Sequence, residues 1–274
     1  MSRLKNTLKN GVYYMYMGYR IIQKLLKGEK NNRIIKNRNV EKPLHILMNG
    51  PSLYKTIDFV NQKPGDIMVA NWAIKDSNIM KLNPKYLCVF DPLFALDNDY
   101  MQLVHIIQEE KEQLEAFMPE IVYDKYVSLY GKQSVHKVNN ICMKRLYESR
   151  VDHKFYKKNW EMPIVSTVSV AALYIGIQLG YNKIYLHGND FSWMKDIDVD
   201  EDGKIVKNDR YFYGNKKEYL EKSMLEYSDA IYSGFLGFYN VARYAEDEHV
   251  TIVNMATESY IDCFEKYTEP NKYV

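Results

Sequence analysis

The sequence predicts an α/β fold with an open, mostly parallel β-sheet. Three apolar runs, at 45–50, 66–71 and 85–91, have the continuous hydrophobicity of strands that are buried on both faces. Segments with helical patterning alternate with these runs, and each run ends in a short polar loop. At 274 residues, 46% of them apolar and 26% charged, the chain can bury a full core and has the composition of a globular protein.

The segment 1–42 is a basic arm. It contains eleven Lys and Arg residues and two Asp and Glu residues, a net charge of +9, whereas the remaining chain has a net charge of −7. Apolar and aromatic residues recur in the arm with the spacing of one helical face, namely Leu4, Leu8, Tyr13, Tyr16, Tyr19, Ile22, Leu25 and Leu26. Two interpretations stay open: a helix on an anionic membrane surface, or a helix packed on its own domain with a solvated basic face. Nucleic-acid arms rarely need such an apolar stripe, so no nucleic-acid partner is expected.

The sequence shows no secretory signal pattern and no apolar run of about 18 residues, the length needed to span a bilayer. Its three cysteines, Cys88, Cys142 and Cys263, are too scattered for a disulfide framework or a zinc site. We therefore expect a cytoplasmic protein, peripheral on the inner face of the membrane.

Small polar residues end the first three predicted strands. Asn49, Asn71 and Asp91 each follow an apolar run, and ligands of open parallel sheets bind at this edge, so the three side chains are expected to converge on one crevice. Each residue singly could also start a turn or cap the next helix. Gly50 is followed by Pro51, which excludes the repeated glycines of a dinucleotide fingerprint.

The second half of the chain predicts a helix, a strand and a further polar edge. The segment 100–119 has the pattern of one amphipathic helix. A helix of small and apolar residues is expected to start near Thr167 and Ser169 and to end at Gly180, and the strand after it delivers His187, Asn189 and Asp190 to the sheet edge. A helix N-terminus with exposed hydroxyls and amides suits a carboxylate or a phosphate.

The polar segment 192–220 is predicted to leave the sheet as a lid. Within it, Asp198–Asp209 fits most of a calcium-loop pattern, but Asp202-Gly203 is a strong turn signal and favours a β-hairpin. The segment 216–248 has helical patterning, and a last strand follows at 250–256.

Two motifs in this order, "NGPSL" at 49–53 and "LGYNKIYLHGNDF" at 179–191, resemble the bacterial sialyltransferases of glycosyltransferase family 42. The resemblance runs over about residues 44–260. It implies a single Rossmann-like domain of a GT-A-like variant with a small lid insertion. It also implies transfer of a sugar, most commonly sialic acid or a related keto-acid sugar, from a CMP-linked donor to a hydroxyl, with inversion and without a metal or another cofactor.

The resemblance also assigns donor-binding residues. The nucleotide and its phosphate would meet Asn49, Gly50 and Ser52, and the nucleotide-sugar would meet Asn71. Asp91 stands where the family more usually has asparagine. The further matching positions are Thr167, Ser169, Gly188 and Asp190.

The sequence departs from the family at the catalytic base. A lid histidine serves that role in the family, and the simplest alignment places Asn215 there, which cannot accept a proton at neutral pH. Tyr211 and Tyr213 remain as hydrogen-bond donors to the departing phosphate. Another residue could be the base, with Glu218, His187 and Asp190 as candidates; otherwise the stereochemistry differs, or the protein binds its ligand without turnover.

The sequence thus predicts three segments: the arm at 1–42, the nucleotide-sugar-binding domain at 43–191 and 221–274, and the lid at 192–220. The expected function is a glycosyltransferase acting on an oligosaccharide or glycolipid acceptor in the assembly of a bacterial surface polysaccharide or lipooligosaccharide. Whether it acts as a homo-oligomer stays open. Two alternatives stay open: a metal-dependent transferase that uses a UDP- or GDP-sugar, and a non-catalytic nucleotide- or carbohydrate-binding accessory protein.

Overall fold

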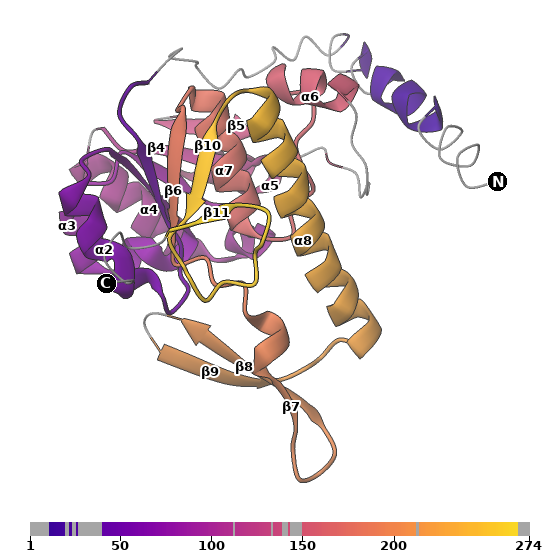
Figure 1. Cartoon of the computed structure of the whole chain (residues 1–274). Helices are drawn as coiled ribbons and strands as arrows, with labels where there is room; N and C mark the ends of the chain where they lie inside the picture. Colours follow the sequence, from indigo (N-terminus) through magenta and orange to yellow (C-terminus); the bar gives the residue numbers. More distant parts are fainter. Residues whose placement is uncertain are drawn as a thin grey trace, which may run out of the picture. The chain divides into compact units, whose positions relative to one another are not determined.

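The computed structural model describes residues 11–19, 22–23, 26, 40–111, 113–132, 134–138, 142, 150–211 and 214–267. The chain divides into two compact units, Met1–Arg33 and Ile34–Val274, which are considered separately. In the first unit, residues 11–19 are helical (indigo in Figure 1), and Val12, Met15, Tyr16 and Tyr19 are exposed there. The predicted apolar positions Leu4, Leu8 and Leu25 lie outside the described residues. No helix in the described part of the chain is long and apolar enough to cross a membrane.

The second unit is built on an eight-stranded parallel sheet in the order β11-β10-β6-β1-β2-β3-β4-β5 (Figure 1). The chain runs outward from β1 to β5 on one side, then returns to place β6 beside β1 on the other. The topological switch point therefore lies between β1 and β6. The strands span Leu44–Leu47 (β1), Asp66–Ala70 (β2), Tyr86–Cys88 (β3), Glu115–Pro119 (β4), Val135–Val138 (β5), Lys183–His187 (β6), Thr251–Asn254 (β10) and Glu265–Lys266 (β11).

Helices cover both faces of the sheet. The pleat sends Ile46 into a core with α7 and α8, and its neighbour Leu47 into a core with α2, α4 and α5. This three-layer arrangement confirms the predicted α/β fold with a mostly parallel sheet. The α-helices span Leu53–Gln62 (α2), Ser77–Lys81 (α3), Asn98–Glu110 (α4), Glu120–Tyr130 (α5), Arg150–Lys157 (α6), Val168–Leu179 (α7) and Met224–Asp247 (α8), and 3-10 helices span Asn71–Lys75 (η1), Pro92–Leu96 (η2) and Trp193–Asp196 (η3).

The prediction of one helix over 100–119 is wrong. Helix α4 ends at Glu110, and Glu115–Pro119 forms β4 between β3 and β5. Phe117 packs into the core beneath α7 and α8, whereas Ala116 and Met118 pack into the opposite core, which is the alternation of a strand. A short apolar run buried on both sides has no periodicity that separates strand from helix, and this explains the error.

The segment after β6 leaves the main sheet as predicted. It holds η3 and a three-stranded antiparallel sheet of Ile197–Val199 (β7), Ile205–Tyr211 (β8) and Gly214–Tyr219 (β9). β7 and β8 form the predicted hairpin, with Gly203 at a φ of 75° in the turn. The prediction of helix from residue 216 is wrong, because 216–219 belongs to β9 and α8 begins only at Met224, where Ser223 and Glu226 form a capping box.

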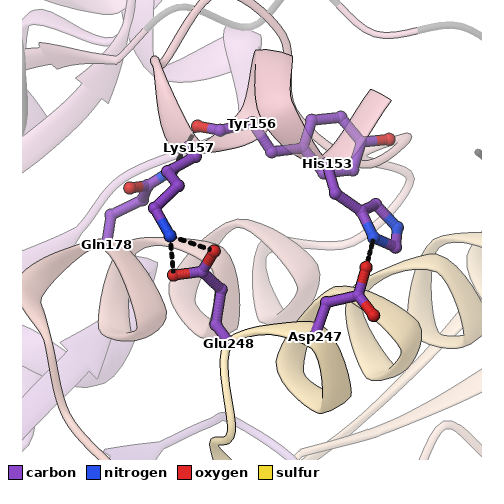
Figure 2. Close-up of polar contacts among 6 residues, drawn as sticks. All are labelled: His153, Tyr156, Lys157, Gln178, Asp247 and Glu248. Carbon is purple, nitrogen blue, oxygen red and sulfur yellow. Dashed lines mark hydrogen bonds and ion pairs between the residues drawn. The ribbon is translucent and has the colours of Figure 1, made fainter. Parts of the chain in front are cut away.

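Two polar contacts fasten α6 to the end of α8 (Figure 2). The Nδ1 atom of His153 lies 2.6 Å from a carboxylate oxygen of Asp247, and Nζ of Lys157 lies 2.8 Å from Oε1 of Glu248. On the other side of α6, the side-chain amide of Gln178 in α7 donates to the carbonyl oxygen of Tyr156. These contacts close the helical layer on the side of the sheet that carries α7.

Candidate functional site

A cavity of about 680 Å³ opens at the carboxyl edge of the parallel sheet. Its walls come from the loops after β6, β1, β2 and β3, from the start of α7 and from β8 and β9. It therefore spans the topological switch point, where open α/β sheets bind their ligands. Of the residues predicted for the site, those that line this cavity are Asn49, Gly50, Asn71, Asp91, Thr167, Ser169, Gly188, Asp190, Tyr211 and Asn215.

The two sequence motifs meet as interlocked loops. The N–H of Gly50 donates to the carbonyl oxygen of Gly188 over 2.8 Å. A Cβ atom at residue 50 would lie 2.2 Å from Oδ2 of Asp190 and 2.4 Å from that carbonyl oxygen, so no larger side chain fits there. Gly188 has a φ of 63°, and its own Cβ would lie 2.8 Å from the carbonyl oxygen of Met48. Both glycines are needed for the loops to approach this closely.

Asp190 ties the first loop to the second. Its Oδ2 atom accepts the backbone N–H of Ser52 over 3.1 Å and the Ser52 hydroxyl over 3.0 Å. Ser52 itself is buried and does not line the cavity. In this structure Ser52 supports the cavity wall through Asp190, whereas the resemblance placed it at the nucleotide.

The N-terminus of α7 forms one wall. Thr167 is the N-cap residue but makes no side-chain capping bond, and Val168 and Ser169 follow it along the wall. The Ser169 hydroxyl donates to Oδ1 of Asn189 over 2.9 Å, which anchors the helix end to the loop after β6. The first backbone N–H groups of a helix lack intrahelical partners and carry partial positive charge, so this wall suits an anionic group.

Three residues of the wall hold unused hydrogen-bonding capacity. Within the described residues, Oδ1 of Asn49, Oγ1 of Thr167 and Nδ2 of Asn189 are buried and have no hydrogen-bond partner. The other amide end of each asparagine is engaged, because Asn49 donates to the carbonyl oxygen of Ala70 and Asn189 accepts from Ser169. A buried polar atom without a partner costs stability, so three of them in one cavity wall need an explanation, and a bound ligand is one that would satisfy all three.

Asn71 and Asp91 stand further along the sheet edge. Oδ1 of Asn71 accepts the backbone N–H of Phe90, and its backbone takes a φ of 47°, which asparagine tolerates better than most residues. Oδ1 of Asp91 accepts the N–H of Leu93 and so caps η2. Both residues thus act as turn and cap residues, and they also line the cavity.

The small antiparallel sheet closes another side. Tyr211 at the end of β8 and Asn215 in β9 line the cavity together with Gly214. Tyr213 lies outside the described residues. Asn215 therefore lines the cavity at the position that the resemblance assigns to the base, and the side chain there is an amide.

His187 is not a cavity residue, which corrects the prediction that it could be the base. It is fully buried on the sheet face that packs against α2, and its Nε2 lies 3.0 Å from Nδ1 of His45 and its Nδ1 lies 3.0 Å from Oγ1 of Thr56. Burial, reinforced by the neighbouring His45, lowers the pKa of His187 to about 3. Glu218, the other distant candidate, does not line the cavity either.

The remaining lining is aromatic or small and was not assigned from sequence. Trp72 and Phe90 follow β2 and β3, and Phe191 and Trp193 follow β6. The aromatic pair after Asp190 has a visible packing reason: the ring of Phe191 occupies the place where Gly234 of α8 lacks a side chain. The signal for Trp72 was its position immediately after Asn71, at the polar end of β2.

The charge of the cavity is unusual for an anion site. No Lys, Arg or His is among its described lining residues, and Asp91 and Asp190 are its carboxylates. No group of three His, Cys, Asp or Glu side chains in the described part of the chain could hold a metal ion. Binding of an anion here would rest on backbone N–H groups, hydroxyls and amides.

Comparison with known proteins finds no matching family model and no matching curated protein. Among solved structures, the sialyltransferase CstII from Campylobacter jejuni with cytidine-5'-monophosphate is similar with a TM-score of 0.46 and 18% identity, covering 84% of this chain and 86% of that one. The MAf glycosyltransferase from Magnetospirillum magneticum AMB-1 gives 0.49 and 14%, covering 85% of this chain but 34% of that one. The sialyltransferase CST-II with a trisaccharide acceptor and CMP gives 0.47 and 18%, with coverage of 83% and 86%. At these values the likeness identifies neither a family nor an activity for this chain.

Proposed function

We propose that this protein is a glycosyltransferase that binds a CMP-linked keto-acid sugar in the cavity and transfers the sugar to a hydroxyl of a surface glycan. The observation that carries the proposal is the wall formed by the start of α7 and the interlocked loops. There, Asn49, Thr167 and Asn189 hold buried polar atoms without partners, beside a helix N-terminus. The two motifs that resemble family 42 sialyltransferases form this same wall.

The absence of Lys and Arg from the described lining favours one phosphate over two. A nucleoside diphosphate brings more charge, which proteins usually neutralise with a metal ion or with cationic side chains. A CMP-linked keto-acid sugar divides its charge between one phosphate diester and the sugar carboxylate, so the phosphate has about one negative charge, which a helix N-terminus with neutral donors can hold. Positioning and neutral hydrogen-bond donors would then stabilise the departing phosphate.

Calorimetric titration of the full chain with CMP, CDP, UDP and GDP, each with and without a chelator, tests the proposal. We expect CMP to bind with the same affinity in the presence of chelator. Preference for a diphosphate that disappears with chelator would refute the proposal and favour the metal-dependent transferase. Absence of binding to any of the four nucleotides would refute a nucleotide-sugar site.

One observation favours a second candidate, a binding protein without turnover. The lid position that holds the base in the resembling family is Asn215, and no histidine lies among the described lining residues. The variant Asn215→His distinguishes the two. Gain of CMP release from a CMP-sugar would support a silent enzyme, whereas an enzyme with another base would be unchanged or impaired.

We further propose that the basic arm brings the protein to an anionic membrane, where glycolipid acceptors lie. The exposed apolar residues of 11–19 and the net charge of the arm support this proposal. When residues 1–42 are deleted, most of the protein should no longer sediment with phosphatidylglycerol vesicles. Equal sedimentation of the truncated chain would refute it.

A further inference from the structure

The cavity carries its functional groups in a row along the sheet edge. Because the strand order is β6, β1, β2, β3, the loop residues follow in the sequence Asp190, Asn49, Asn71 and Asp91. Strands lie about 4.8 Å apart, so β6 and β3, from whose ends the loops of Asp190 and Asp91 start, are separated by three spacings, about 14 Å. The two carboxylates therefore come from loops at opposite ends of the row.

The α7 end of the row is the place for the phosphate. Ser169 is bonded to Asn189, which fixes the helix N-terminus beside the loop after β6. At the same end, Oδ2 of Asp190 accepts both the Ser52 N–H and the Ser52 hydroxyl, so this carboxylate belongs to the contact between the two loops. A nucleotide with its phosphate at this end directs the sugar, and the acceptor that attacks it, toward the loops after β2 and β3.

Asp91 stands at that far end with an available oxygen. It lines the cavity and is half-buried, and within the described residues its one side-chain partner is the N–H of Leu93, which Oδ1 accepts. Oδ2 has no partner there. The other candidate bases fail: His187 is the buried last residue of β6, and Glu218 does not line the cavity. Asp190 lines it at the α7 end, beside the place of the phosphate, and Asn215 carries no basic group.

We infer that Asp91 is the general base of the transfer, an inference that rests on the proposed function. As the acceptor hydroxyl attacks the anomeric carbon, its proton passes to Oδ2 of Asp91 and a new carbon–oxygen bond forms. The bond from the anomeric carbon to the phosphate oxygen breaks, and its electron pair leaves on that oxygen as CMP. Asp91 then returns its proton to solvent.

The test compares Asp91→Asn with Asp97→Asn. Both aspartates cap helices at the two ends of η2, and asparagine caps as well as aspartate, so neither change should disturb folding. Asp97 does not line the cavity. We expect Asp91→Asn to bind CMP as the wild type does but to release CMP from CMP-N-acetylneuraminate or CMP-3-deoxy-octulosonate about 10² to 10⁴ times more slowly. Asp97→Asn should keep the wild-type rate.

A second readout separates a base from a positioning residue. In Asp91→Ala, added formate should restore part of the rate, because a small carboxylate can enter the vacated place and accept the proton. A rate for Asp91→Asn within threefold of the wild type would overturn the inference while leaving the proposed function intact. CMP binding without turnover of either donor would also overturn the inference, and it would favour the binding protein without turnover over the transferase. Failure of the wild type to bind CMP would overturn the proposed function itself.

Discussion

A buried histidine pair makes the stability of this protein depend on pH below about pH 6.5. His45 and His187 lie side by side on β1 and β6, with 3.0 Å between Nδ1 of His45 and Nε2 of His187. Nε2 of His45 lies 2.7 Å from the carbonyl oxygen of Lys63, to which it must donate. With both rings neutral, His187 then donates to His45 and accepts from the Thr56 hydroxyl, so every group is satisfied without charge.

The sign of the effect follows from burial. Desolvation is the largest cause that lowers the pKa of both histidines, to about 3 for His187. In the unfolded chain a histidine has a pKa of about 6.5, so below that pH the unfolded state binds protons that the folded state does not. Stability is therefore full above pH 6.5 and falls as the pH drops toward 3.

The size can be worked out for two convenient conditions. For His187 alone, going from pH 7.5 to pH 5 should lower the free energy of unfolding by about 2 kcal/mol. His45 adds to this in the same direction. Asp66 and Asp76, whose pKa values are lowered from 3.8, lose their contribution only at more acidic pH and leave this window undisturbed.

Urea unfolding at pH 7.5 and pH 5 measures the effect, with His187→Gln as the perturbation. Glutamine keeps a donor toward His45 but removes the titrating ring, so the pH-dependent loss should shrink by about 2 kcal/mol even if the variant is less stable at both pH values. His249→Asn, at an exposed position with a φ of 58°, serves as the control and should keep the wild-type dependence. A wild-type change below about 0.5 kcal/mol, or an unchanged pH dependence in His187→Gln, would refute the reasoning.

Two further variants test the cavity wall. Gly50→Ala places a Cβ 2.2 Å from Oδ2 of Asp190 and 2.4 Å from the Gly188 backbone, so it should cost about 1–3 kcal/mol of stability by urea unfolding and weaken CMP binding. The control Gly18→Ala, where nothing lies within 4 Å of the added Cβ, should do neither. Unchanged stability of Gly50→Ala would contradict the interlocked loops. Thr167→Val removes a buried hydroxyl that has no partner, so the temperature of thermal unfolding should be unchanged or higher while CMP affinity falls about tenfold. An unchanged affinity would show that this hydroxyl does not contact the ligand.

Much of the cavity edge could be predicted from sequence. The polar ends of the apolar runs at Asn49, Asn71 and Asp91 were sufficient, because the carboxyl ends of parallel strands share one edge and the loops after them must lie together. The helix that starts at Val168 could also be predicted from sequence, because its small apolar residues favour a helix and Gly180, which has a φ of 91°, ends it. These features depend on local pattern and on one topological rule.

Other features depended on contacts that no local pattern contains. His187 and Asn189 are two residues apart but lie in different places. The pleat of β6 directs both Tyr185 and His187 toward α2. Asn189 comes after the end of the strand and lines the cavity. The bond between Ser52 and Asp190 joins residues 138 positions apart. The segment 115–119 became a strand because the sheet offered it two neighbours and a core on each face. Local hydrophobicity fixed which segments are buried, and only the packing of distant segments decided their strand or helix form, their facing and which polar atoms were left for a ligand.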